Sequence, residues 1–141
     1  MSIPSQNSAQ ISHILGVDFG QSKIGLALAD TETRMAFAYD TLANDQKFQE
    51  KLAEIAAKEN VEKIIIGIPS YVNIKKEESA GEKLGKIIEK ELQISVEYQD
   101  EMFTTKMAKE NLIESGAKSV DKNNDAEAAR IILQSWLDKA V

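Results

Sequence analysis

The chain of 141 residues has no cysteine, two prolines and one histidine. Without cysteine, disulfide bonds and thiolate-bound metal centres are excluded, and the lone His13 cannot hold a zinc cluster by itself. No apolar run approaches the roughly 18 residues that a membrane-spanning helix needs. The first ten residues show neither the basic start nor the apolar block of a secretory signal. We therefore expect a cytoplasmic protein with no membrane segment.

The composition suits a folded protein, with 43% apolar and 28% charged residues. The length fits one domain, and we expect residues 1–11 to form a disordered tail and residues 12–141 a single domain. The net charge of −6 weighs against a nucleic-acid binder, since such proteins usually present a basic face. Acids gathered in a metal site would supply part of this excess, and bound cations would offset them locally.

The apolar pattern predicts strands first and then alternating helices and strands. Lys63 to Ile68 is a short apolar run ended by Pro69, which is typical of a central parallel strand. The expected strands are residues 12–18, 23–30, 35–42, 63–68 and 94–98, and the expected helices are residues 45–59, 76–91, 104–115 and 124–138. This order predicts an α/β fold. Its five-stranded mixed sheet would open with a three-strand antiparallel meander, continue with parallel strands and carry helices on both faces.

Asp18 ends the first expected strand and is followed by Phe19 and Gly20. A carboxylate at the end of a buried strand is costly to desolvate unless it is hydrogen-bonded or bound to a metal. The residues from Phe19 to Ser22 suit a hairpin, in which Gly20 is free to take a positive φ. Gly20 and Gly25 would also leave room for a phosphate, although Gly25 equally suits close packing. An ordinary Asp–Gly hairpin turn is the competing explanation.

Two further acids lie at the ends of expected elements. Glu101 follows the last expected strand, and Asp125 opens the last expected helix, on one face with Ala128 and Ala129. Either acid alone is explained by the preference of helix N-termini for negative charge. If Asp18, Glu101 and Asp125 converge, their repulsion calls for a cation, and oxygen ligands suit a hard divalent metal such as Mg²⁺. The pattern therefore indicates a metal-dependent phosphoryl-transfer enzyme.

Taken together, the motifs resemble the YqgF family, Holliday-junction-resolvase-like proteins that are also described as pre-16S rRNA nucleases. The resemblance rests on four segments in the family's order, namely residues 15–25, 66–69, 100–105 and 125–137. It implies an RNase H-like fold, which agrees with the element order. It also implies that Asp18, Glu101 and Asp125 are the catalytic metal ligands. Trp136, in the last segment, is expected in the core.

The resulting hypothesis is phosphodiester hydrolysis with two Mg²⁺ or Mn²⁺ ions, in processing of the 5′ end of pre-16S rRNA. Asp18 would bridge the ions, and Glu101 and Asp125 would each hold one. Lys23, Thr104 and Thr105 are candidates for contacts with the phosphates of the nucleic acid. The expected partner is pre-rRNA or branched DNA. The protein would be a monomer or a homodimer, since symmetric cutting of a four-way junction needs two sites.

Two departures from the family pattern keep alternatives open. Met102 stands where the family usually has an arginine, which binds phosphate in a bidentate manner. Residues 70–76 lack the glycine that the family tends to have there. Met102 favours a catalytically weak nucleic-acid-binding or ribosome-assembly factor. A second alternative is an acetate- or sugar-kinase-like phosphotransferase, but such enzymes need two domains of this kind and the chain provides one.

Overall fold

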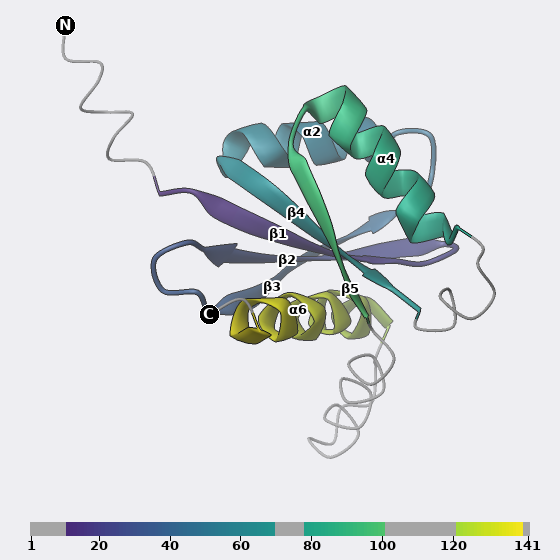
Figure 1. Cartoon of the computed structure of the whole chain (residues 1–141). Helices are drawn as coiled ribbons and strands as arrows, with labels where there is room; N and C mark the ends of the chain where they lie inside the picture. The colour runs from purple at the N-terminus through teal and green to yellow at the C-terminus, as the bar shows by residue number, and fades with distance from the viewer. Residues whose placement is uncertain (1–10, 70–77, 101–120, 140–141) are drawn as a thin grey trace, which may run out of the picture.

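The computed structural model describes residues 11–69, 78–100 and 121–139, except for the side chains of residues 121–124. A five-stranded sheet in the order β3-β2-β1-β4-β5 lies between helices α2 and α4 on one face and α6 on the other (Figure 1). The elements are β1 (His13–Phe19), β2 (Lys23–Asp30), β3 (Ala36–Ala43), α2 (Phe48–Lys58), β4 (Val61–Ile68), α4 (Ala80–Leu92), β5 (Ser95–Asp100) and α6 (Asp121–Lys139). The expected helix 104–115 and nearly all of the expected tail lie outside the described residues.

The sheet is mixed, as the sequence predicts. β2 runs antiparallel to both β1 and β3, whereas β4 is parallel to β1 and β5 is parallel to β4. The carboxyl ends of β1, β4 and β5 therefore meet at one edge of the sheet. In open sheets of this kind, ligands usually bind at that edge.

The hairpin between β1 and β2 forms as expected, but Gly20 plays a different part in it. The Gly20 N–H donates to the carbonyl of Lys23 at 3.1 Å. The backbone of Gly20 does not adopt the positive φ that the sequence suggested, so that prediction is wrong. Glycine is needed there because a Cβ atom would lie only 2.5 Å from the Lys23 carbonyl oxygen.

The start of α4 is fixed by a cap. The Ser79 hydroxyl accepts from the Glu82 N–H at 3.2 Å, and the Glu82 carboxylate accepts from the Ser79 N–H at 2.9 Å. This capping box begins the helix at Ala80, so the predicted start at residue 76 is not observed. Gln93, in the left-handed conformation with a φ of 56°, ends it.

α6 begins earlier than the sequence predicts. The described helix starts at Asp121, so Asp125 lies in its second turn and does not open it. The attraction of an acid to a helix N-terminus is concentrated in the first turn. That competing explanation for Asp125 therefore loses much of its force.

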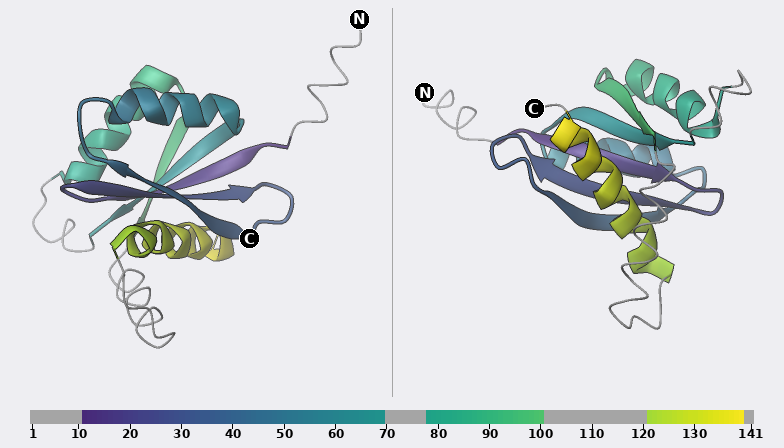
Figure 2. Two further views of the ribbon diagram at one scale, coloured as in Figure 1. Left: turned by 180° about the vertical axis from the view of Figure 1, so that it is seen from behind. Right: turned by 60° about the horizontal axis from the view of Figure 1, so that its bottom comes forward.

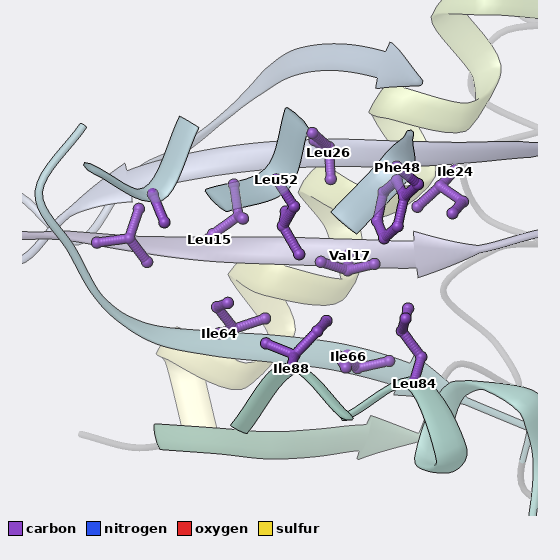
Figure 3. Packing of buried hydrophobic residues seen from close by; sticks show 12 residues of the cluster. Leu15, Val17, Ile24, Leu26, Phe48, Leu52, Ile64, Ile66, Leu84 and Ile88 are labelled. Carbon is purple, nitrogen blue, oxygen red and sulfur yellow. The ribbon is translucent and has the colours of Figure 1, made fainter. Parts of the chain in front are cut away.

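The two faces of the sheet bury different side chains. Between the sheet and α2 and α4, large aliphatic side chains from β1, β2 and β4 interdigitate with Phe48, Leu52, Leu84 and Ile88 (Figure 3). Under α6, Ile14, Ile65 and three alanines of the strands pack against Ala129, Leu133 and Leu137. Figure 2 shows α6 running along its own side of the sheet, away from α2 and α4. Within the described part of the chain, no helix has the length and apolar character needed to cross a membrane.

Candidate functional site

Asp18 lies on the α6 face, at the carboxyl edge of the sheet. A Cβ atom added to Gly16 would lie 2.7 Å from the Cβ atom of Leu133 in α6, so position 16 faces that helix. Side chains alternate along a strand, and Asp18 therefore projects toward the same side. It is half-buried. The central strand thus presents this carboxylate where the sheet ends and α6 passes.

The backbone of α6 reaches the sheet beside Asp18. Gly25 of β2 is the partner of Asp18 in the β1–β2 ladder. A Cβ atom at Gly25 would lie 1.9 Å from the carbonyl oxygen of Asp125. Of the two roles that the sequence allowed for Gly25, close packing is the observed one, and the close neighbour is Asp125. Two of the three predicted carboxylate residues therefore belong to adjoining parts of one edge.

The third predicted ligand lies just beyond the described residues. β5 ends at Asp100, which pairs with Ile68 at the end of β4, and Glu101 is the next residue. Glu101, Met102, Thr104 and Thr105 are all outside the described residues, so their predicted roles stay predictions. Among residues 11–69, 78–100 and 121–139, no three His, Cys, Asp or Glu side chains gather closely enough to hold a metal ion. A complete metal centre here would need Glu101.

Lys23 is the described candidate for a phosphate contact. It is exposed at the start of β2, next to Ile24, which pairs with Phe19 at the end of β1. The ammonium group is therefore carried at the same edge as Asp18. A contact between Lys23 and nucleic acid stays a prediction.

A polar cluster on the α6 face joins α6 to β4 and β5. Lys63 donates to Glu97 at 2.6 Å, and the Trp136 indole N–H donates to the other Glu97 oxygen at 3.1 Å. The Lys63 ammonium also lies 5.4 Å from the centroid of the Trp136 ring, within the range of a cation–π contact. The hydrogen bond from Lys63 lowers the pKa of Glu97, and the bond from Trp136 adds to this against the opposing effect of burial. Trp136, which was expected in the core, is partly buried at its margin and also anchors α6.

Gln99 is a polar residue of β5 near this edge, and sequence reasoning gave it no role. It pairs with Gly67 of β4 and lies two residues after Glu97, so alternation turns it toward α6. Its side-chain oxygen is buried and has no hydrogen-bond partner within the part of the chain that the structure describes. The polar residues Glu97 and Gln99 share one strand face of β5, and this period of two was the available signal. The neighbouring positions in this row across the sheet are Gly25, Asp18, Gly67 and Gln99.

Comparison with known sequences gives a consistent result. Residues 12–139 match the RuvX family, described as Holliday junction resolvase. A Bacteroides fragilis protein named “Putative pre-16S rRNA nuclease” is 33% identical over 135 residues, which cover 91% of this chain and 97% of the relative. A Clostridium botulinum protein of the same name is 34% identical over 132 residues, covering 89% of this chain and 96% of the relative.

Solved structures support the fold. RuvC of T. thermophilus in complex with a Holliday junction substrate is similar with a TM-score of 0.56 and 15% identity, covering 92% of this chain and 95% of that one. The Fowlpox virus resolvase, in complex with Holliday junction DNA, has a TM-score of 0.55 and 13% identity, covering 92% and 99%. The fold is the RNase H-like one that the sequence predicted. With its family match and its relatives, the chain belongs to the RuvX family of Holliday-junction-resolvase-like proteins.

Proposed function

We propose that this protein is a nuclease that hydrolyses phosphodiester bonds with the help of two Mg²⁺ or Mn²⁺ ions. The observation that carries the proposal is the contact between Gly25 and the Asp125 carbonyl, because Gly25 is the ladder partner of Asp18. This contact brings Asp18 and Asp125 to one edge of the sheet, although the two residues are far apart in the sequence. β5 leads the chain toward the same edge just before Glu101.

The donor set fits a hard divalent cation. The ligands would be the carboxylate oxygens of Asp18, Glu101 and Asp125, and Mg²⁺ and Mn²⁺ prefer oxygen ligands of this kind. The chain has no cysteine and one histidine. That histidine, His13, lies at the start of β1, at the other end of the strand from Asp18. A thiolate or imidazole site is therefore not available at this edge.

In this mechanism the protein's own residues bind, orient and fix the reacting groups. Asp18 is held by the central strand and Asp125 by α6, whose position on the sheet is fixed by Gly25 and by the Trp136–Glu97 bond. Lys23 would bind a phosphate of the substrate at the rim. When bound, the metal ions supply an activated water for attack and stabilise the negative charge on the leaving 3′ oxygen.

The substrate that we favour is the precursor of 16S rRNA, cut near its 5′ end. The names of the curated relatives support this choice. Branched DNA is the alternative substrate, because the structural neighbours with this fold hold Holliday junctions. The second candidate function is a weak or inactive nucleic-acid-binding factor. It is favoured by Met102 at the position where the resemblance expects an arginine.

The test is a cleavage assay that offers a 16S rRNA precursor and a four-way DNA junction, each with Mg²⁺, with Mn²⁺ and with a chelator. We expect metal-dependent cleavage of the RNA by the wild type and none by Asp18→Asn. Asp40→Asn is the matched control, since Asp40 is an exposed carboxylate on β3. It should cut like the wild type. Cleavage that persists in folded Asp18→Asn contradicts the proposal, whereas binding without cleavage by the wild type supports the second candidate.

A further inference from the structure

A hollow of about 520 Å³ opens on the α2 and α4 side of the sheet. Its described lining comes from the end of β1, the connection from β3 to α2, the first turn of α2 and the first two turns of α4. Phe48 and Leu84 are its buried apolar residues, and Figure 3 shows both near the carboxyl end of β1. Protein pockets that hold small organic groups have volumes of about 300–1,000 Å³. The hollow is therefore large enough for a nucleotide base.

Phe19 joins this hollow to the candidate site. It follows Asp18 on β1, and it packs on the α2 and α4 side whereas Asp18 projects toward α6. The wall beside Phe19 is fixed, because the Asn44 side-chain nitrogen donates to the carbonyls of Gly20 at 2.8 Å and Gln21 at 3.1 Å. These bonds tie the connection before α2 to the hairpin that follows β1. A strand with a phosphodiester bond at Asp18 can therefore turn a neighbouring base across the edge into the hollow.

The side chains of the lining suit an unpaired base. Phe19 is a half-buried aromatic residue, and Gln46 and Gln49 are exposed amides. Proteins bind the bases of single strands by stacking them on aromatic rings and by hydrogen bonds to their edges. The charge also suits nucleic acid, although the whole chain carries −6. Lys83 is exposed at the hollow. Asp45, the only carboxylate among the described lining residues, accepts a backbone N–H two residues further on at 2.9 Å.

We propose that this hollow is a base pocket, which binds one unpaired base of a nucleic-acid strand. Phe19 stacks on the base, and Gln46 and Gln49 form hydrogen bonds with its edge. Lys83 binds a phosphate of the same strand. The inference deepens the proposed function and rests on it, because the strand is the proposed substrate. It requires no metal ion, since all of these contacts come from described side chains. RNA and DNA present the same kind of base, so the experiment offers both.

The test measures binding of short single strands by fluorescence anisotropy, with a chelator present so that no strand is cut. Each RNA or DNA strand is compared with an abasic strand of the same length and charge. Stacking on an aromatic ring is worth about fivefold in affinity or more. We expect Phe19→Leu to weaken binding of the base-bearing strands by about this factor and to leave binding of the abasic strand unchanged. Phe37→Leu is the matched control, since Phe37 is 63% exposed on β3 and does not line the pocket. It should bind both kinds of strand like the wild type.

Lys83→Gln tests the pocket through charge. It removes one phosphate contact, so we expect weaker binding of both kinds of strand and a salt dependence whose slope is smaller by about one. Lys90→Gln is the control, because Lys90 is also exposed on α4 but lies outside the pocket lining. It should keep the wild-type slope.

Three results would overturn the base pocket. The first is wild-type affinity of Phe19→Leu for the base-bearing strands, and the second is an equal loss on the abasic strand. The third is an unchanged salt slope in Lys83→Gln, which decides the matter even if Phe19→Leu fails to fold. Cleavage separates this failure from failure of the proposed function. If the pocket variants bind like the wild type while cleavage by the wild type still depends on Asp18, only the base pocket falls. If the wild type shows the expected base-dependent binding but cuts neither substrate, the base pocket stands and the nuclease proposal falls.

Discussion

The same strands present two very different surfaces on the two faces of the sheet. Toward α2 and α4 they bury the large side chains of Leu15, Val17, Ile24, Leu26, Ile64 and Ile66. Toward α6 they present Gly16, Asp18, Gly25, Ala27, Ala29 and Gly67 among fewer large residues. One face is built for apolar burial. The small residues of the other let the α6 backbone come close beside the Asp18 carboxylate, so that face carries the candidate site.

This difference also changes how the helices are held. Each large aliphatic side chain buried under α2 and α4 contributes about 1.5–3 kcal/mol. Two tyrosine hydrogen bonds add to this packing, from Tyr98 to the Glu82 carbonyl of α4 and from Tyr39 to the Glu59 carboxylate just after α2. α6 rests on smaller side chains and adds polar contacts to its packing. Arg34 donates to the Leu137 carbonyl at 2.9 Å, Gln134 accepts from Ala36, and Trp136 donates to Glu97. Directional bonds of this kind set the position of a helix more narrowly than apolar contact does.

Gly25→Ala should have the largest effect on cleavage and stability, because it adds a methyl group where the α6 face has no room. The new Cβ atom would lie 1.9 Å from a backbone oxygen of Asp125, so α6 must shift. We expect loss of cleavage and a decrease in the free energy of unfolding of about 3 kcal/mol, measured by denaturant unfolding beside the cleavage assay. Gly81→Ala is the control on the other face, with its closest contact at 3.2 Å to a side-chain methyl of Ile66. A Gly25→Ala variant that stays stable and active would contradict the described contact.

Leu52→Ala should separate stability from activity. Leu52 is fully buried against the sheet on the α2 side, and its truncation leaves a cavity. We expect a loss of about 3 kcal/mol in the free energy of unfolding. The cleavage rate per folded molecule should stay at the wild-type value, since no candidate metal ligand lies on that face and Leu52 does not line the base pocket. A large fall in the rate at temperatures where the variant is fully folded would show that the two faces are not independent.

Replacing Glu97 on the α6 face by glutamine should lower the free energy of unfolding slightly, by an amount that depends on pH. Its folded pKa is lowered from 4.5 by Lys63 and Trp136, so its contribution to stability is fully present above pH 4.5 and is lost as the pH falls through the lowered value. The side chain is 44% exposed, and solvent screening keeps the effect below about 1 kcal/mol. The stability difference between wild type and Glu97→Gln should therefore shrink from pH 7 to pH 3. A difference that grows toward acid would contradict this assignment.

The sequence was sufficient for the sheet because its strands carry a strong local signal. The apolar run from Lys63 to Ile68 and the Asp18 hairpin locate β4 and the β1–β2 pair, and the mixed sheet was predicted correctly. Helix starts were less predictable. The Ser79 cap decides where α4 begins, and α6 starts before the predicted residue. The contact between Gly25 and Asp125 joins residues too distant in sequence for any local pattern to show.

The buried, unpaired side-chain oxygen of Gln99 could not be predicted from the sequence either. In a polar stretch such as residues 97–101, a glutamine is normally predicted to be exposed to solvent. Its place in the sheet follows from its pairing with Gly67 of β4, a contact between residues far apart in the sequence. The alternation of positions 97 and 99 gave the direction of the side chain but no reason to expect its oxygen to be buried. Glu101, Thr104 and Thr105 remain sequence-based predictions.

The placement of Asp18 on β1 and Asp125 on α6 has a consequence for biosynthesis. A nascent polypeptide that has not yet delivered α6 can form much of the sheet but holds one carboxylate of the pair. If these two residues act as we propose, phosphodiester cleavage must wait until distant parts of the chain come together, a step that is slow relative to local folding. The proposed nuclease would then gain its activity only once α6 has docked on the sheet.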